Sequence, residues 1–266
     1  MCSSDLAGSA TAVVAATLYG SNPYRTHLLI ASTKEEAYYL QNDIEALLDD
    51  TDTESDRKRV LLFPTSYRNP YQTDDVANAN VLQRTEVTKQ LNAGRNLVVV
   101  TYAEALSEKV ASQRTLTANT LQIVDGTNLD MDFVVEVLME YDFDRVDFVV
   151  EPGQYALRGG IIDVFSYGNE TPYRIEFDGD QVGSLRAFDP VSQLSVKRYE
   201  SIAIVPDLNG RHQADGGIQK VEEKVTLAHY LGQNDIIWVD GLMGTLETID
   251  KTYGKAVDMY EAVKDS

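Results

Sequence analysis

The sequence predicts an α/β fold in which a parallel-sheet domain contains an inserted, β-rich α+β domain. Continuous apolar runs at 27–32, 59–64 and 96–102 are separated by segments with helical spacing, as expected for a parallel sheet covered on both faces. Residues 145–190 form short alternating segments punctuated by turns, which is typical of antiparallel strands. Residues 235–263 again place an apolar run before a long helical segment.

The first domain is expected over residues 1–115. Thr33 and Glu36 have the spacing of a capping box, which predicts that a helix begins there and continues to residue 49. A second helix is predicted over 74–94, where Gly94 is a favourable stop signal. The three apolar runs are therefore joined by helices, as the crossover connections of a parallel sheet require.

The inserted domain is expected over 116–207 and the return to the first sheet over 208–266. In the insertion, the sequence predicts a strand at 116–126 and a helix at 129–142. After it, the sequence predicts in order a helix, a strand and a long helix, at 221–231, 235–240 and 241–263.

Composition limits the classes of partner. The 266-residue chain has 42 acidic and 23 basic residues, which gives a formal net charge of -19. A surface that follows nucleic-acid phosphates normally needs clustered Lys and Arg. We therefore expect little or no direct nucleic-acid binding by this chain.

The cysteine and histidine content excludes further classes of site. Cys2 is the sole cysteine, so an internal disulfide and a zinc site built on two or more cysteines are impossible. His27, His212 and His229 are scattered, and we predict no metal and no cofactor. No apolar run approaches the roughly 20 residues that span a bilayer, and the start lacks a basic signal-peptide region. We expect no membrane contact and a cytoplasmic protein.

A degenerate phosphate-binding loop is predicted at Gly8, Ser9, Ala10 and Thr11, just before an apolar helical stretch. A working loop of this kind needs a lysine that reaches the β- and γ-phosphates and a hydroxyl for Mg²⁺. No alignment of this segment supplies the lysine. We therefore predict a helix N-terminus with small residues and no ATP hydrolysis by this chain.

The strongest motif lies in the insertion. Three strings follow one another, EPGQYALRGGIIDVF (151–165), PYRIEFDGD (172–180) and SLRAFDP (184–190). Together they resemble the module shared by the nucleotide-excision-repair protein UvrB and the transcription-repair coupling factor Mfd. This resemblance implies a RecA/UvrB-like P-loop fold for the first domain.

The resemblance is to the Mfd family rather than to UvrB. UvrB would keep the loop lysine and would carry a long tyrosine-rich hairpin early in the chain. Here Tyr67 and Tyr71 are followed directly by the predicted helix at 74–94, which leaves no room for that hairpin. The chain is expected to be an N-terminal fragment of a longer protein.

The resemblance also implies a docking surface. In both families the β-rich domain binds UvrA, the damage-recognition subunit, through arginines that meet acidic groups. The matching arginines here are Arg158 in LRGG and Arg174 in PYRIEF. Asp178 stands where the family has a second aromatic residue of the docking surface. Arg186 also matches a family position, either as a rim contact or as a structural partner of Asp180 or Asp189.

The resulting expectation is a non-catalytic recruitment module that docks UvrA in transcription-coupled repair. The resemblance implies that the full-length protein is an ATP-dependent DNA translocase that also binds RNA polymerase and DNA. One alternative is an enzyme, a UvrB-like nucleotide-dependent protein that verifies DNA damage. A further alternative is a structural domain that has lost UvrA binding, because Asp178 replaces an apolar anchor with a carboxylate.

Overall fold

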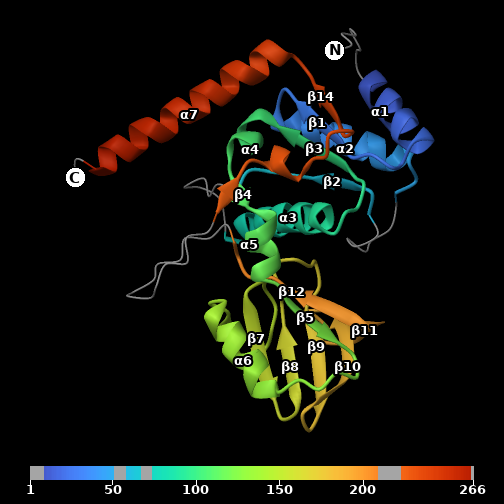
Figure 1. Ribbon diagram of the computed structural model, residues 1–266, viewed down its shortest axis with the longest axis vertical. Coiled ribbons are helices and arrows are strands. Elements are labelled where there is room, and N and C mark those ends of the chain that lie inside the picture. Colours follow the sequence, from blue (N-terminus) through green and yellow to red (C-terminus); the bar gives the residue numbers. More distant parts are fainter. Residues whose placement is uncertain (1–8, 51–57, 67–73, 209–222, 265–266) are drawn as a thin grey trace. The chain divides into compact units, whose positions relative to one another are not determined.

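The computed structural model describes residues 9–50, 58–66, 74–208 and 223–264 (Figure 1). The chain divides into two compact units. The first, called the α/β unit below, comprises residues 1–110 and 224–266, and the second, called the β-rich unit, comprises residues 111–223.

A four-stranded parallel sheet forms the centre of the α/β unit. Its strand order is β14, β1, β3, β2, with bounds Ile236–Val239, His27–Ala31, Val98–Tyr102 and Val60–Leu62. The sheet confirms the predicted parallel arrangement, because β1 pairs in parallel with both β3 and β14. Strand β14 comes from the C-terminal part of the chain, so this unit is built from segments on both sides of the β-rich unit.

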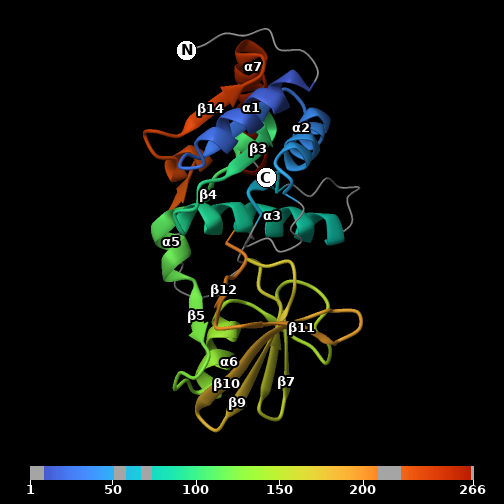
Figure 2. The ribbon, with the colours of Figure 1, turned by 90° about the vertical axis from the view of Figure 1, so that its right-hand side faces the viewer.

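Helices cover both faces of this sheet. The helices of the α/β unit are α1 (Ala10–Ser21), α2 (Lys34–Leu47), α3 (Asp74–Asn92), α4 (Ala103–Ser107), the 3₁₀ helix η1 (Leu227–Tyr230) and α7 (Leu242–Lys264), and of these α2 and α3 pack directly on the strands. Figure 2 shows α1 beside α2, and α3 on the other side of the strands. This follows from right-handed crossovers, because the chain passes from β1 out to β2 and then back to β3. The capping box is confirmed, with Thr33 and Glu36 each accepting the other's backbone N–H at 3.2 Å.

An antiparallel sheet of six strands dominates the β-rich unit. Its order is β11, β10, β9, β8, β7, β6, with bounds Ser195–Tyr199, Gln181–Phe188, Tyr173–Asp178, Ile161–Val164, Gln154–Arg158 and Asp144–Arg145. The strand β6 alone runs parallel to its neighbour. The remaining elements are α5 (Gln113–Ala118), β5 (Leu121–Val124), α6 (Met131–Glu140) and β12 (Ser201–Ile204), and β5 pairs with β12.

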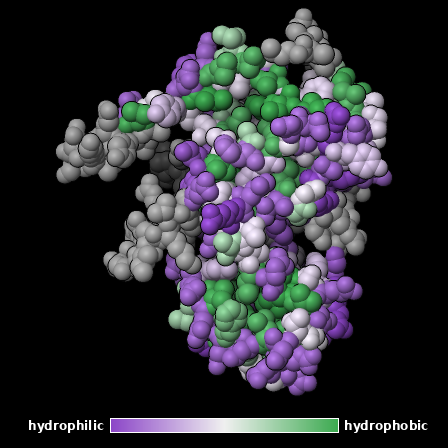
Figure 3. All heavy atoms as spheres, viewed as in Figure 1, coloured by the Kyte–Doolittle hydropathy of each residue, from purple (hydrophilic) through white to green (hydrophobic). Residues whose placement is uncertain are grey.

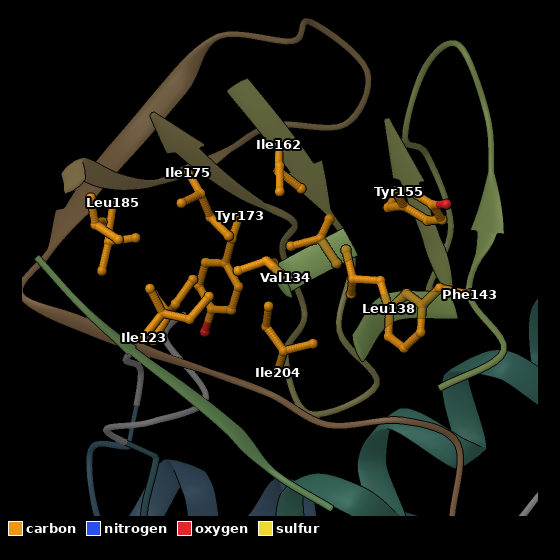
Figure 4. Packing of buried hydrophobic residues seen from close by; sticks show 13 residues of the cluster. Ile123, Val134, Leu138, Phe143, Tyr155, Ile162, Tyr173, Ile175, Leu185 and Ile204 are labelled. Carbon is orange, nitrogen blue, oxygen red and sulfur yellow. The ribbon is translucent and has the colours of Figure 1, made fainter. Parts of the chain in front are cut away.

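One face of the six-stranded sheet carries the core of this unit. Val134 and Leu138 of α6 are fully buried and pack against alternate residues of the strands, as Figure 4 shows. The cluster also draws on β5 and β12, through Ile123 and Ile204. Because alternate residues of a strand point to opposite faces, the intervening side chains lie on the other face of the sheet.

Two predicted elements differ from the structure. Residues 116–126 do not form one strand, because Ser112 caps a short helix, α5, by accepting the Thr115 backbone N–H at 3.2 Å. The segment 221–231 is not an α-helix over its described part. It forms the short strand β13 (Lys224–Val225), which pairs with β4 (Val110–Ala111). One 3₁₀ turn follows and ends at Leu231, whose backbone is extended.

The surface of the α/β unit includes apolar side chains. Figure 3 shows hydrophobic residues over β14 and the first turns of α7. Ile237, Leu242 and Met243 are 53%, 50% and 70% exposed. None of the described helices is long and apolar enough to cross a membrane.

Candidate functional site

The register of the six-stranded sheet brings the predicted docking residues to one face. Asp163 of β8 pairs with Arg174 of β9, which in turn pairs with Arg186 of β10. Ile161 is opposite both Arg158 and Glu176, so these residues share the same face. We call this the arginine face and define it by Arg158, Asp163, Arg174, Glu176, Asp178, Arg186 and Arg198. It lies opposite the face that packs against α6.

Arg174 is bound by a buried carboxylate. Its Nε and Nη2 donate to Oδ1 and Oδ2 of Asp163 at 2.7 and 2.8 Å, and the Asp163 side chain is 1% exposed. The guanidinium also lies 4.6 Å from the ring centroid of Phe188. This hydrogen-bonded carboxylate raises the pKa of Arg174 above its ordinary value. Arg174 is therefore mainly occupied within the sheet, with a side chain only 17% exposed.

Arg158 is more accessible. Its side chain is 39% exposed, and its Nη1 lies 3.9 Å from Oδ2 of Asp163. Its Nη2 donates to the backbone carbonyl of Asp147 at 2.8 Å, and its guanidinium lies 4.7 Å from the centroid of the Phe148 ring. These contacts fix the orientation of the guanidinium while leaving a substantial part of the side chain open to solvent.

Arg186 pairs with Glu176, whereas the structural alternative considered from the sequence named Asp180 or Asp189. The other alternative, a rim contact, stays a prediction. The Arg186 Nη2 donates to Glu176 Oε2 at 3.1 Å, with side chains 39% and 34% exposed. Ser184 donates to the same oxygen at 2.7 Å. The strand register explains this pair, because Arg174 is directly opposite Arg186 and Glu176, two residues further along β9, is the diagonal neighbour on the same face.

The remaining members of the arginine face lie toward its borders. Asp178 is exposed at the end of β9, directly before Gly179, whose φ of +61° makes the turn into β10. Arg198 of β11 donates to Asp125 at 2.9 Å. Each of the four arginines thus has a carboxylate neighbour, so the face combines ordered guanidinium groups with near-neutral local charge.

The predicted phosphate-loop residues lie at the start of α1. Ser9 is the N-cap residue but forms no side-chain capping bond, and Ala10 and Thr11 open the helix. Gly8 lies outside the described residues. The first lysine in the chain is Lys34, which begins α2. Over the described ranges, no group of three or more metal-ligating side chains could hold a metal ion.

Sequence reasoning missed residues that order the arginine face. Asp163 gave no signal of its role, because its partner Arg174 is 11 positions away and only the strand register brings them together. Phe148 and Gln193 were also missed. Phe148 lies in the loop between β6 and β7 beside Arg158, and the Gln193 carbonyl accepts from Arg174 at 3.4 Å. The alternation of β8 and β9 could have placed Asp163 opposite an arginine once their pairing was assumed.

Comparison with known proteins identifies the β-rich unit. Residues 121–209 match the family of the UvrB interaction domain. This segment begins at β5, ends just after β12 and so includes the whole arginine face. The β-rich unit carries a UvrB interaction domain.

Full-length relatives agree with this domain assignment. The chain is 29% identical over 204 residues to the transcription-repair-coupling factor of Bacillus subtilis and 28% identical over 204 residues to that of Escherichia coli, in both cases covering 76% of this chain. A UvrABC system protein B from Treponema denticola is 29% identical over 86 residues, 32% of this chain and 13% of its own length. These matches support the resemblance to the N-terminal UvrB-like module of the coupling factors. The matched region spans 16% and 17% of the two coupling factors.

Proposed function

We propose that this chain is a recruitment module of a transcription-repair-coupling factor and that its arginine face docks UvrA. The observation that carries the proposal is the match of residues 121–209 to the UvrB interaction domain, because this segment contains every residue of the arginine face. In this proposal the module performs no catalysis. It brings the damage-recognition subunit to the site at which the coupling factor acts.

The chemistry of the face supports docking of an acidic surface. Arg158 and Arg186 present partly exposed guanidinium groups whose orientation is fixed by internal contacts. A planar guanidinium can bind a carboxylate through two parallel hydrogen bonds. Because the side chains are already ordered, less rotamer entropy is lost when the partner binds.

The α/β unit is proposed to serve as a scaffold derived from a RecA/UvrB-like P-loop fold. It keeps a parallel sheet with helices on both sides, but its first helix begins without the lysine that phosphate binding needs. In the full-length protein we propose RNA polymerase and DNA as further partners and ATP-driven translocation as the activity, both supplied by other parts of that protein.

Isothermal titration of the chain with purified UvrA tests the docking proposal. The variant Arg158→Ala/Arg186→Ala should bind at least roughly 100-fold more weakly, since each arginine donates charge-assisted hydrogen bonds of about 1.5–3 kcal/mol. Arg174 is left intact because its loss would strand the buried Asp163 carboxylate. Arg145→Ala is the matched control. Arg145 is exposed, and in the strand register it is opposite Tyr155, which belongs to the core face and not to the arginine face. Equal binding by wild type and the double variant would refute the proposal.

A thermal-shift titration separates this proposal from the nucleotide-dependent alternative. A ligand that binds only the folded state raises the melting temperature. We expect Mg²⁺-ATP to leave the melting temperature of this chain unchanged. A concentration-dependent rise would instead support a nucleotide-binding protein.

A further inference from the structure

Exposed apolar side chains border the arginine face on one side. Phe148, Val150, Val191, Leu194 and Val196 are 62%, 49%, 92%, 68% and 62% exposed. They come from the β6–β7 loop, from the β10–β11 hairpin and from the start of β11. We call this group the apolar rim. Exposed apolar residues that gather beside ordered polar groups are characteristic of interaction surfaces.

The two loops that carry the apolar rim are in contact. The Gln193 side chain donates to the backbone carbonyl of Val149 at 3.3 Å and to that of Pro190 at 2.7 Å. Val149 is fully buried and packs with Ala156, Phe165 and Phe188. Because Val149 points inward, its neighbours Phe148 and Val150 are directed outward, which explains their exposure.

Each loop is also ordered by its own hydrogen bonds. The backbone N–H groups of Val150 and Glu151 both donate to Gln154 Oε1, at 3.0 and 3.1 Å. In the hairpin, the Ser192 N–H donates to Asp189 Oδ1 at 2.6 Å, and the Gln193 N–H donates to the Asp189 carbonyl at 2.7 Å. The apolar rim is therefore held in place before any partner arrives, which lowers the entropic cost of binding.

The apolar rim is continuous with the arginine face. The Arg158 guanidinium lies over the Phe148 ring at 4.7 Å, and the Gln193 carbonyl accepts from Arg174. Val196 lies two residues before Arg198 in β11, at the position where the register shifts between Ser195 and Lys197. Apolar contacts and guanidinium groups are thus available side by side to one partner surface.

We propose that the apolar rim forms the second half of the docking surface and seats an apolar side chain of UvrA that lies beside the carboxylate bound by Arg158. This inference rests on the proposed function and adds the chemistry of the partner, an apolar residue next to Asp or Glu. The apolar anchor excludes water from the ion pair, and an ion pair without water is stronger than an exposed one.

The test is a UvrA titration of the variant Phe148→Ser/Leu194→Ser. We expect binding at least roughly tenfold weaker than wild type, because the apolar contact and the exclusion of water from the ion pair are both lost, and an unchanged melting temperature because both side chains are exposed. Phe133→Ser/Met139→Ser is the matched control. These two residues are 47% and 66% exposed but lie on α6, which covers the opposite face of the sheet, and we expect them to leave binding unchanged.

The outcomes separate this inference from the proposed function. In one outcome, wild type binds UvrA, the Arg158→Ala/Arg186→Ala variant loses binding, and the affinity of Phe148→Ser/Leu194→Ser for UvrA changes less than twofold. This outcome would overturn the inference and leave the proposed function intact. Absence of binding by wild type would overturn both. Sedimentation equilibrium measures the oligomeric state of the chain. If wild type is a dimer and Phe148→Ser/Leu194→Ser is a monomer, the apolar rim is a contact between copies of this chain, and the inference is overturned.

Discussion

Asp163 and Arg174 face each other across strands β8 and β9, joined by two hydrogen bonds of 2.7 and 2.8 Å. The same carboxylate lies 3.9 Å from Arg158. One buried acidic residue therefore orders two of the arginines that we assign to docking. Its contribution to stability can be measured apart from its contribution to binding.

Arg174→Ala should destabilise the protein by about 3 kcal/mol. The substitution leaves the Asp163 carboxylate buried without its main partner, and breaking a buried pair costs about 3–5 kcal/mol; we expect the lower end because Arg174 is 17% exposed. Urea denaturation followed by circular dichroism measures the change. Arg186→Ala is the control and should cost less than about 1 kcal/mol, since its pair with Glu176 is partly exposed. Equal effects of the two substitutions would contradict the structural role of Asp163.

Gly153→Ala should destabilise the protein more than Gly159→Ala. Both glycines have positive φ, +84° and +61°, so both variants incur the left-handed backbone cost of about 1–2 kcal/mol. A Cβ at residue 153 would lie 2.5 Å from the hydroxyl of Tyr167, whereas a Cβ at residue 159 would meet no atom within 4 Å. The clash adds about 1–3 kcal/mol. The difference between the two melting temperatures isolates the clash, and no difference would be inconsistent with the packing of Tyr167.

His27 should make the stability of the α/β unit dependent on pH. Burial lowers its pKa below the ordinary 6.5, partly opposed by Asp235 and aided by Arg25. Below about pH 6.5 the unfolded chain therefore binds a proton that the folded chain does not, and the free energy of unfolding falls. Above pH 6.5 this contribution is fully present.

The fluorescence of Trp238 can follow this effect, because its ring lies 5.9 Å from that of His27 and it is the sole tryptophan. Urea denaturation at pH 7.5 and at pH 5.5 should give a smaller pH-dependent loss for His27→Phe than for wild type. His229→Gln, which changes an exposed histidine, is the control and should behave as wild type. A pH dependence that His27→Phe leaves unaltered would assign the effect to other groups.

Asp178→Phe should strengthen UvrA binding. Residue 178 is exposed on the arginine face, and the family resemblance places an aromatic residue there. An aromatic side chain would add apolar contact and remove a carboxylate from a surface that we propose meets acidic groups. Titration should show a gain of several-fold. Glu136→Phe, at an exposed position of α6 on the opposite side of the sheet, controls for non-specific adhesion, and an equal gain in both variants would argue against a specific contact.

Much of the fold could be predicted from local patterns. The continuous apolar runs anticipated β1, β2 and β3, and the Thr33–Glu36 spacing anticipated the start of α2. These features succeed because burial on both faces and helix capping are local properties of the sequence. The prediction of a helix over 221–231 was wrong over the described residues, because the apolar spacing there suits either a helix or one 3₁₀ turn. The pairing of β13 with β4 favours the 3₁₀ turn.

The candidate site was harder to predict than the strands. The family motif pointed to Arg158 and Arg174, but it gave no means to distinguish the accessible guanidinium from the occupied one. That distinction depends on Asp163, which contacts both through strand pairing. For Arg186, the structural alternative named Asp180 or Asp189 instead of Glu176 for the same reason, because Glu176 is its neighbour across β9 and β10 rather than along the chain.

Hydrogen–deuterium exchange of the chain with and without UvrA shows directly whether the arginine face is the docking surface. We predict slower exchange in the β6–β7 loop at 146–152, in the turn at 178–181 and in the hairpin at 189–196, because these segments border the arginine face. We predict unchanged exchange in α1, α2 and α3. Slower exchange confined to the α/β unit, with no change at 146–152, 178–181 and 189–196, would contradict docking of UvrA on the arginine face.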